Sequence, residues 1–231
     1  MKILNKAVLQ QAEKVLQSHL PKSFMVYGYL FGMNRNRPHT LEFVVDCWPN
    51  FKTIICRPHP KIENSLLYTK ELTFFSTDEK DLKRMLMEDN VLDWNKYFKI
   101  GGIDIRHGTM LKAISAAKGV TLRQGTIDHI LELQDPSLLP QLKLSRDVEA
   151  RISSLNESHV GLVNKTWKFG EYRERGYAKI LTYTMAARLH AQGFPMYCSI
   201  EEGNQVSYRL VKKMGLTEDP SFRATCYEFN Y

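Results

Sequence analysis

The most chemically suggestive stretch of the sequence is RERGYAK, a turn of basic and small residues that leads into a segment with helical periodicity. The first amides of a helix have no partner within the helix and lie at the positive end of its dipole, so they attract anions. Gly176 and Ala178 would let a phosphate approach closely, and Arg173, Arg175 and Lys179 could donate charge-assisted hydrogen bonds to its oxygens. Because an arginine-flanked glycine at a helix start is common by chance, the surrounding elements decide whether the turn binds an anion.

The residues after this turn predict a helix, a strand, a second helix and a final strand. The first helix ends at Gly193, and its expected apolar face consists of Ala178, Leu181, Met185 and Leu189. MYCSI alternates as a strand, and Asn204 stands at the N-cap of the helix QVSYRLVKKM, which Gly215 closes. In the last stretch, ATCYEFNY, one strand face carries Thr225, Tyr227, Phe229 and Tyr231. This order of elements is that of a half-wound sheet.

Few side chains near these elements could move a proton. Glu201 and Glu202 follow the strand MYCSI and could reach a cleft beside the turn, although solvated loop carboxylates are the favoured interpretation. His159 and His190 are interpreted as surface or core histidines rather than as bases. No residue is therefore assigned as catalytic.

The N-terminal half predicts a mixture of helices and strands. Residues 1–20 predict an amphipathic helix, because one set of side chains recurs at helical spacing: Leu4, Val8, Ala12, Val15 and His19. Three β-rich stretches follow, FMVYGYLFG, LEFVVDCW and FKTIICR, and we expect them to form a meander. LLYTKELTFFS predicts a fourth strand, and a capping box between Ser76 and Glu79 opens a helix. One face of that helix carries Leu82, Met85 and Leu86.

A loop at Gly101 and Gly102 is expected to lead to the short helix MLKAISAAKG, which Gly119 ends. TIDHILEL fits either a helix or a strand. The two prolines of QDPSLLP mark the best linker, so we place a boundary near residue 145, between domains 1–145 and 146–231. Beyond it a further helix is expected, with Val160, Val163, Asn164 and Trp167 at spacings of three and four.

The composition limits the class of protein. A chain of 231 residues with 43% apolar residues has room for one large domain or two small ones. Its net charge of +7 suits an anionic small molecule, a nucleic acid or an acidic membrane surface, but the basic residues are spread along the chain. The four cysteines lack CxxC or zinc spacing and are interpreted as free thiols in a reducing compartment. No apolar run reaches membrane-spanning length, so a soluble protein without a membrane span or a bound metal is expected.

The stretches RERGYAKIL and GFPMYCSIEEGNQVSYRLVKKMGL resemble the coenzyme A binding motif, and the strand and helix that follow it, in the GNAT acyltransferase superfamily. VYGYLFGMN, VVDCWPNF, DWNKYFKI and SHVGLVNKTWKFG are similar, more narrowly, to the two-domain glycine N-acyltransferases. The likeness covers nearly the whole chain. It implies an α/β (α+β) fold of two GNAT-like domains with mixed sheets flanked by helices.

The resemblance also implies an activity: transfer of an acyl group from acyl-coenzyme A, as co-substrate rather than tightly bound cofactor, to glycine or another small amino acid. It implies a mitochondrial location. The cofactor-binding residues implied are the turn, in which Tyr177 joins the residues named above, and Asn204, which can also be a plain helix cap. Where the superfamily often has a tyrosine that protonates the departing thiolate, this chain has Val211, and Tyr208 is not assigned that role.

In the family, several tens of residues separate the WxFG element from the RxxGxA turn, whereas here Gly170 and Glu171 are adjacent. The C-terminal domain is therefore expected to lack central strands, together with the family's general base. An alternative function follows, in which a catalytically silent, shortened member at most binds coenzyme A or a partner protein. Nucleic-acid binding, a third possibility, rests on net charge alone, so no nucleic-acid partner is expected. The sequence leaves the oligomeric state open.

Overall fold

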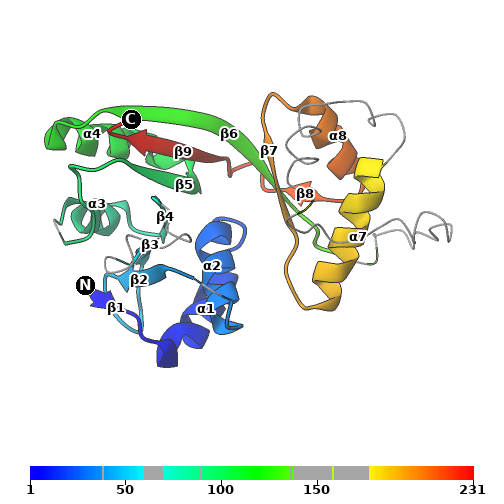
Figure 1. Cartoon of the computed structure of the whole chain (residues 1–231), viewed down its shortest axis with the longest axis horizontal. Coiled ribbons are helices and arrows are strands. Elements are labelled where there is room, and N and C mark those ends of the chain that lie inside the picture. The colour runs from blue at the N-terminus through cyan, green and yellow to red at the C-terminus, as the bar shows by residue number, and fades with distance from the viewer. Residues whose placement is uncertain (38, 60–69, 89, 136, 138–157, 159–176) are drawn as a thin grey trace. The chain divides into compact units, whose positions relative to one another are not determined.

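The structure is a computed structural model, which describes residues 1–231 except 38, 60–69, 89, 136, 138–157 and 159–176 (Figure 1). It divides into two compact units. Unit 1 comprises Met1–Leu131, Tyr197–Gln205 and Glu218–Tyr231, and unit 2 comprises Glu132–Met196 and Val206–Thr217. The boundary expected near residue 145 falls outside the described residues and stays a prediction.

The chain begins with β1 (Lys2–Ile3), η1 (Lys6–Val8) and α1 (Leu9–Gln17). The helix predicted for residues 1–20 is confirmed only over α1, and its predicted apolar face is wrong apart from Ala12, because α1 buries Leu9, Ala12 and Leu16 while Val15 is half-buried. Leu4 and Val8 precede α1, and His19 follows it. The first residues of the predicted helix instead form β1, which pairs antiparallel with β2 (Leu41–Val45).

The first predicted strand, FMVYGYLFG, is wrong, because these residues form α2 (Phe24–Asn34). Aromatic and β-branched residues favour strands, and the segment is apolar all round, so no polar face reveals the helix. The buried residues nevertheless recur at helical spacing: Val26, Tyr27, Leu30 and Phe31. Packing of α2 against α1 and the sheet overrides the local preference.

The strands predicted at LEFVVDCW, FKTIICR and LLYTKELTFFS are confirmed as β2, β3 (Thr53–Pro58) and β4 (Glu71–Ser76), which form an antiparallel meander. The predicted meander is therefore wrong in its first member, which is α2, and β4 takes the third place instead. The helix after β4 is α3 (Glu79–Met87), which buries Leu82, Met85 and Leu86 as predicted. The predicted capping box is wrong. Asp78 caps the helix, and the Oγ of Ser76 accepts a hydrogen bond from the Asp78 amide at 3.0 Å instead.

β5 (Phe98–Asp104) runs parallel to β4. The loop predicted at Gly101 and Gly102 is wrong, because both residues lie in a bulge within β5. Gly102 has a φ of +63°, and a Cβ there would lie 2.6 Å from the side chain of Met25. The two glycines thus permit a bulge in β5 and the close packing of Met25 against Gly102, and they do not form a loop.

η2 (Ile105–His107) leads from β5 into α4 (Gly108–Lys118), which ends at Gly119 with a φ of +66° as predicted. TIDHILEL proves to belong to a strand, β6 (Leu122–Glu132). The C-terminal strand β9 (Ala224–Phe229) lies between β5 and β6 and is antiparallel to both. Of the face predicted for this strand, Thr225, Tyr227 and Phe229 are buried, whereas Tyr231 is 60% exposed. The last residues of the chain therefore supply an inner strand of unit 1.

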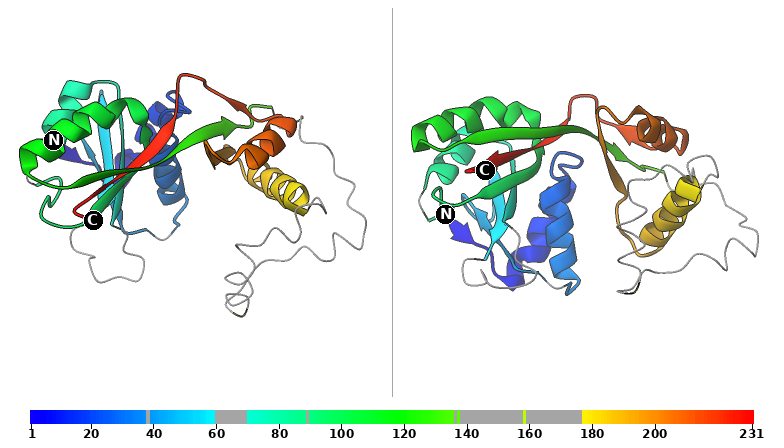
Figure 2. Two further views of the ribbon diagram at one scale, coloured as in Figure 1. Left: turned by 90° about the horizontal axis from the view of Figure 1, so that it is seen from above. Right: turned by 45° about the horizontal axis from the view of Figure 1, so that its top comes forward.

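Helices cover both faces of this sheet, whose order is β1-β2-β3-β4-β5-β9-β6-β7, with β7 at Tyr197–Glu201. Figure 2 shows α1 and α2 on one face and α3 and α4 on the other. The main core combines residues of α3 and α4 with strand residues such as Ile55, Phe74, Ile100, Tyr227 and Phe229. The predicted mixed α/β class, with a mixed sheet flanked by helices, is confirmed.

Unit 2 contains α7 (Tyr177–Ala191) and most of α8 (Gln205–Lys213), and β8 (Thr217–Glu218) follows. The sequence of α7, β7, α8 and β9 confirms the predicted order of helix, strand, helix and strand. The predicted apolar face of α7 is wrong: Tyr183 and Ala186 are buried, whereas Leu181 and Met185 are each 56% exposed. Apolar residues occur on several sides of this helix, so the sequence does not single out the buried one. The helix predicted around Trp167 lies outside the described residues.

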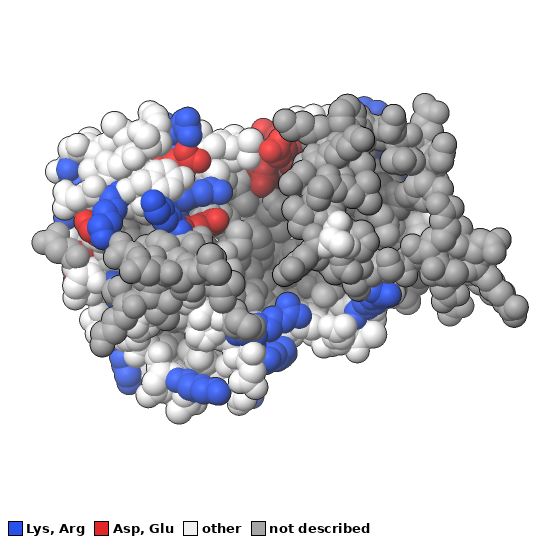
Figure 3. All heavy atoms as spheres, in the orientation of Figure 1, with Lys and Arg blue, Asp and Glu red and all other residues white. Residues whose placement is uncertain are grey.

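All four cysteines are free thiols, as predicted: Cys47, Cys56, Cys198 and Cys226. Every helix in the described part of the chain is too short or too polar to cross a bilayer. On the face drawn in Figure 3, the described basic side chains are scattered among neutral and acidic ones rather than joined in one patch.

Candidate functional site

The predicted anion-binding turn is described only at its C-terminal end. Arg173, Arg175 and Gly176 lie outside the described residues, and α7 begins at Tyr177, directly after them. The helix that the prediction requires is therefore present. For Tyr177, Ala178 and Lys179 only the helical backbone is described. Phosphate binding at this turn stays a prediction.

Asn204 lies between β7 and α8, at the predicted helix start, and is exposed. Its backbone amide donates a hydrogen bond to the carbonyl of Glu201 at 2.8 Å. Glu201 and Glu202 are exposed, in agreement with solvated carboxylates. Glu201 thus ends β7, and Glu202 and Asn204 lie in the connection from β7 to α8 within unit 1. Contact of Asn204 with a cofactor stays a prediction.

The start of α3 is unsuitable for binding an anion. It follows β4 as a strand-to-helix connection, but the carboxylate of Asp78 already accepts hydrogen bonds from the amides of Lys80 and Asp81, at 3.1 and 3.3 Å. These amides, together with the nearby ammonium of Lys52, hold the pKa of Asp78 below its ordinary value. Glu79 and Asp81 add negative charge in the first turn. A phosphate would meet repulsion and filled donors there.

The first turn of α7, in contrast, contains no acidic residue and includes Lys179. Arg173 and Arg175 precede it in the sequence, as do Glu171 and Glu174. Of these two helix starts, the one that begins α7 therefore has no acidic residue in its first turn and is the better suited to an anionic ligand.

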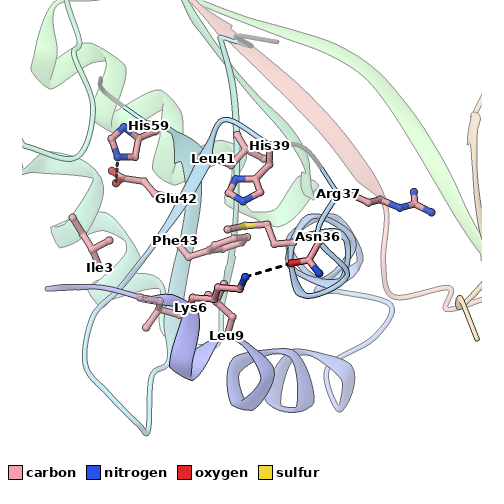
Figure 4. A pocket seen from close by; sticks show the side chains of 12 residues that line it. Ile3, Lys6, Leu9, Asn36, Arg37, His39, Leu41, Glu42, Phe43 and His59 are labelled. Atoms are coloured by element: carbon pink, nitrogen blue, oxygen red, sulfur yellow. Dashed lines mark hydrogen bonds and ion pairs between the residues drawn. The ribbon is translucent and has the colours of Figure 1, made fainter. Parts of the chain in front are cut away.

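A second feature, which sequence reasoning missed, is a cavity of about 650 Å³ in unit 1 (Figure 4). Buried apolar side chains line its floor, namely Leu4, Leu9, Leu41 and Phe43. Exposed polar side chains line its mouth, namely Lys6, Asn36, Arg37 and His39. The spacing of these residues in the sequence does not reveal the cavity, because they come from the segment after β1, η1, α1, the segment after α2 and β2, and only the fold brings them together.

The polar groups of this cavity have distinct roles. The ammonium of Lys6 donates to Oδ1 of Asn36 at 3.4 Å, a long hydrogen bond. Figure 4 shows these two side chains turned toward each other, whereas Arg37 points away from the other labelled residues. Glu42, which also lines the cavity, is paired with Arg57, whose Nε and Nη2 lie 2.8 and 2.7 Å from its Oε1. The buried guanidinium thus balances the charge of that carboxylate.

His107, the last residue of η2, is a half-buried titratable group. Its Nδ1 lies 3.4 Å from Oε2 of Glu79 without hydrogen-bonding geometry, and its ring meets that of Phe74 edge-on at 5.3 Å. Burial lowers the pKa of His107, which outweighs the opposing effect of Asp104. Burial thus disfavours the charged form of the imidazole. Among the described residues, no cluster of histidine, cysteine and acidic side chains could hold a metal ion.

Comparison with known proteins gives the family. Glycine N-phenylacetyltransferase from Bos taurus is 27% identical to this chain, and the match covers 90% of this chain and 74% of that protein. Glycine N-acyltransferase from the same organism is 29% identical with the same coverage. An X-ray structure of a Drosophila protein, 13% identical, has a TM-score of 0.73 and covers 98% of this chain and 97% of its own, which shows a shared fold.

Human glycine N-acyltransferase is 23% identical, and the match covers 88% of this chain and 90% of that protein. This alignment extends over 266 positions, which exceeds the 231 residues of the chain, so the human protein has internal residues without a counterpart here. That finding agrees with an internally shortened member, and the position of the gap beside Gly170 stays a prediction. Residues 1–179 match the family profile described as aralkyl acyl-CoA:amino acid N-acyltransferase, and the chain belongs to this family.

Proposed function

We propose that this protein transfers an acyl group from acyl-coenzyme A to the amine of glycine or a related small amino acid. The observation that carries the proposal is the family match over residues 1–179, which extends into the first residues of α7. The first turn of that helix supports it, because it contains no acidic residue and includes Lys179, and the diphosphate of coenzyme A needs donors and positive charge.

In the proposed reaction, the amine nitrogen attacks the thioester carbonyl, a C–N bond forms and the C–S bond breaks. The thiolate that leaves takes up a proton, and the amine loses one. An amino-acid amine is mostly protonated at neutral pH, so a positioned base would contribute about a hundredfold to ten-thousandfold in rate. Glu201, at the end of β7, and Glu202, in the connection that holds Asn204, are exposed acids, but we assign neither of them as the base.

The test is consumption of phenylacetyl-coenzyme A in the presence of single amino acids, followed by release of the thiol. We expect turnover that requires glycine or another small amino acid and that saturates with both substrates. Thioester loss at the same rate with and without any amino acid would contradict the proposal.

A second candidate function is favoured by one observation, namely the internal residues that the human relative has and this chain lacks. A shortened C-terminal half could bind acyl-coenzyme A without transferring the acyl group. Calorimetric binding without amino-acid-dependent turnover would select this silent form, and turnover well above background would exclude it.

We also propose a mitochondrial location, which rests on the family resemblance. Residues 1–20 include the amphipathic α1, with Lys2 and Lys6 before it. Imaging of the full chain with a C-terminal fluorescent tag should show overlap with a matrix marker. A diffuse signal throughout the cell would contradict the proposal.

A further inference from the structure

We propose that the cavity of unit 1 binds a small amphipathic carboxylate, with its apolar body on the floor and its charged head at Lys6 and Asn36. The proposal concerns residues between Ile3 and His59 and does not depend on the proposed acyl transfer. It assigns a binding site to a part of the chain that lies apart in sequence from the RERGYAK turn.

The floor suits an apolar body of limited size. Leu4, Leu9, Leu41 and Phe43 are each at most 9% exposed and present only their edges to the cavity, whereas the half-buried Met33 and the exposed Ile3 supply further apolar surface. A volume of about 650 Å³ falls within the range of roughly 300 to 1,000 Å³ that is usual for small-molecule sites. An aromatic ring or a medium-length alkyl chain would cover the apolar surface that stays exposed here, which a fully polar ligand would not do favourably.

The charge at the mouth favours a single anionic group. The ammonium of Lys6 has three N–H donors, and in the described part of the chain its hydrogen bond is the long one to Asn36. A carboxylate could accept from Lys6 and from the side-chain amide of Asn36 together. Glu42 does not oppose it strongly, because Arg57 pairs with that carboxylate at 2.7 Å.

The same geometry argues against a polyphosphate in this cavity. Phosphate sites gather several cations or a series of backbone amides. Here Arg37 points away from the other labelled side chains (Figure 4), and the side chain of Asn5 already accepts from the Ala7 amide at the start of η1. One ammonium and one amide match the charge and size of a carboxylate.

The test is calorimetric titration of the full chain with phenylacetate and with octanoate. Phenylacetamide serves as the neutral counterpart with the same ring, and acetate as the counterpart without an apolar body. Lys6→Gln removes the ammonium at the mouth. Lys14→Gln, on an exposed lysine of α1 outside the cavity, is the matched control.

We expect both acids to bind the wild type and Lys14→Gln equally, and Lys6→Gln about tenfold or more weakly, because one charge-assisted hydrogen bond is lost. Phenylacetamide and acetate should each bind at least about tenfold more weakly than phenylacetate. Met33→Trp, which fills the cavity from a half-buried position, should weaken both acids while the circular dichroism spectrum is retained.

Three results would overturn the proposal. The first is the absence of binding of either acid at millimolar concentration. The second is equal affinity of the Lys6→Gln and Lys14→Gln variants, and the third is equal affinity for phenylacetate and phenylacetamide. A Gly176→Leu variant should bind phenylacetate as the wild type does, because Gly176 does not line the cavity. This variant therefore separates loss of carboxylate binding in the cavity from loss of coenzyme A binding at the start of α7.

Discussion

The inner position of β9 leads to a direct prediction: replacement of Phe229 by alanine should destabilise unit 1 strongly. Phe229 is 0% exposed, stacks on Phe98 at 4.6 Å and meets Trp94 edge-on at 5.5 Å. Its backbone is registered with Phe98 of β5 on one side and Leu122 of β6 on the other. Both strands and the aromatic cluster therefore depend on this residue.

The magnitude follows from the buried ring. Replacement of a buried phenylalanine by alanine costs about 3–5 kcal/mol, and a small domain is stable by about 5–15 kcal/mol in total. Tyr231→Ala is the matched control, because this ring, two residues further along, is 60% exposed and has a single cation–π contact, with Arg123 at 4.6 Å. That control should cost no more than about 1 kcal/mol.

Urea unfolding followed by tryptophan fluorescence measures the difference, because Trp94 lies beside Phe229 in the core. A fragment of residues 1–145 provides an independent test. It lacks β9 and should not fold cooperatively, whereas addition of a peptide of residues 218–231 should restore a transition. A loss below about 1 kcal/mol for Phe229→Ala, or a stable fragment without the peptide, would refute the inner position of β9.

Three further perturbations test other parts of the fold. Gly102→Ala should lower the free energy of unfolding by more than Gly119→Ala, since both have positive φ but a methyl group at Gly102 would lie 2.6 Å from a neighbouring side chain; equal losses in thermal melts would contradict the bulge packing. The pKa of His107 is lowered from its ordinary value of 6.5, so below that pH the unfolded chain binds the proton first and stability falls as the pH decreases. His107→Asn should reduce the dependence of the free energy of unfolding on pH, measured by urea titrations between pH 7 and 5. An unchanged dependence would contradict the assigned role of His107. Tyr183→Ala should cost about 3–5 kcal/mol. Leu181→Gln should change the free energy of unfolding by less than about 0.5 kcal/mol. A larger loss for Leu181→Gln than for Tyr183→Ala would instead support the apolar face of α7 that the sequence predicts.

The sequence predicted elements wherever local chemistry and burial agree. The strands from Leu41 and Thr53, α4 with its Gly119 cap, and the order from α7 to β9 all follow from periodicity and turn residues. α2 could not be recognised in this way, because a segment that is apolar on every side has no helical polar face and its aromatic residues favour strands. Burial against other elements decides its form.

The candidate sites show the same division. The basic turn and the helix after it could be predicted, because a glycine, basic residues and a helical pattern are adjacent in sequence. The cavity could not, because Lys6, Asn36 and Phe43 come together only after β1 pairs with β2 and α2 packs beside them. The bulge of β5 was hidden for a similar reason, since a pair of glycines predicts a loop as readily as a bulge.

The most direct test of the proposed function is the affinity of the chain for an acyl-coenzyme A when the start of α7 is altered. Phenylacetyl-coenzyme A is titrated calorimetrically into the wild type, Gly176→Leu and Gly28→Leu, the last adding the same side chain at an exposed helical glycine with open space around it. We predict unchanged affinity for Gly28→Leu and at least about tenfold weaker binding for Gly176→Leu, because the bulky side chain keeps the phosphates from the helix amides. Equal affinity of all three proteins would contradict the account.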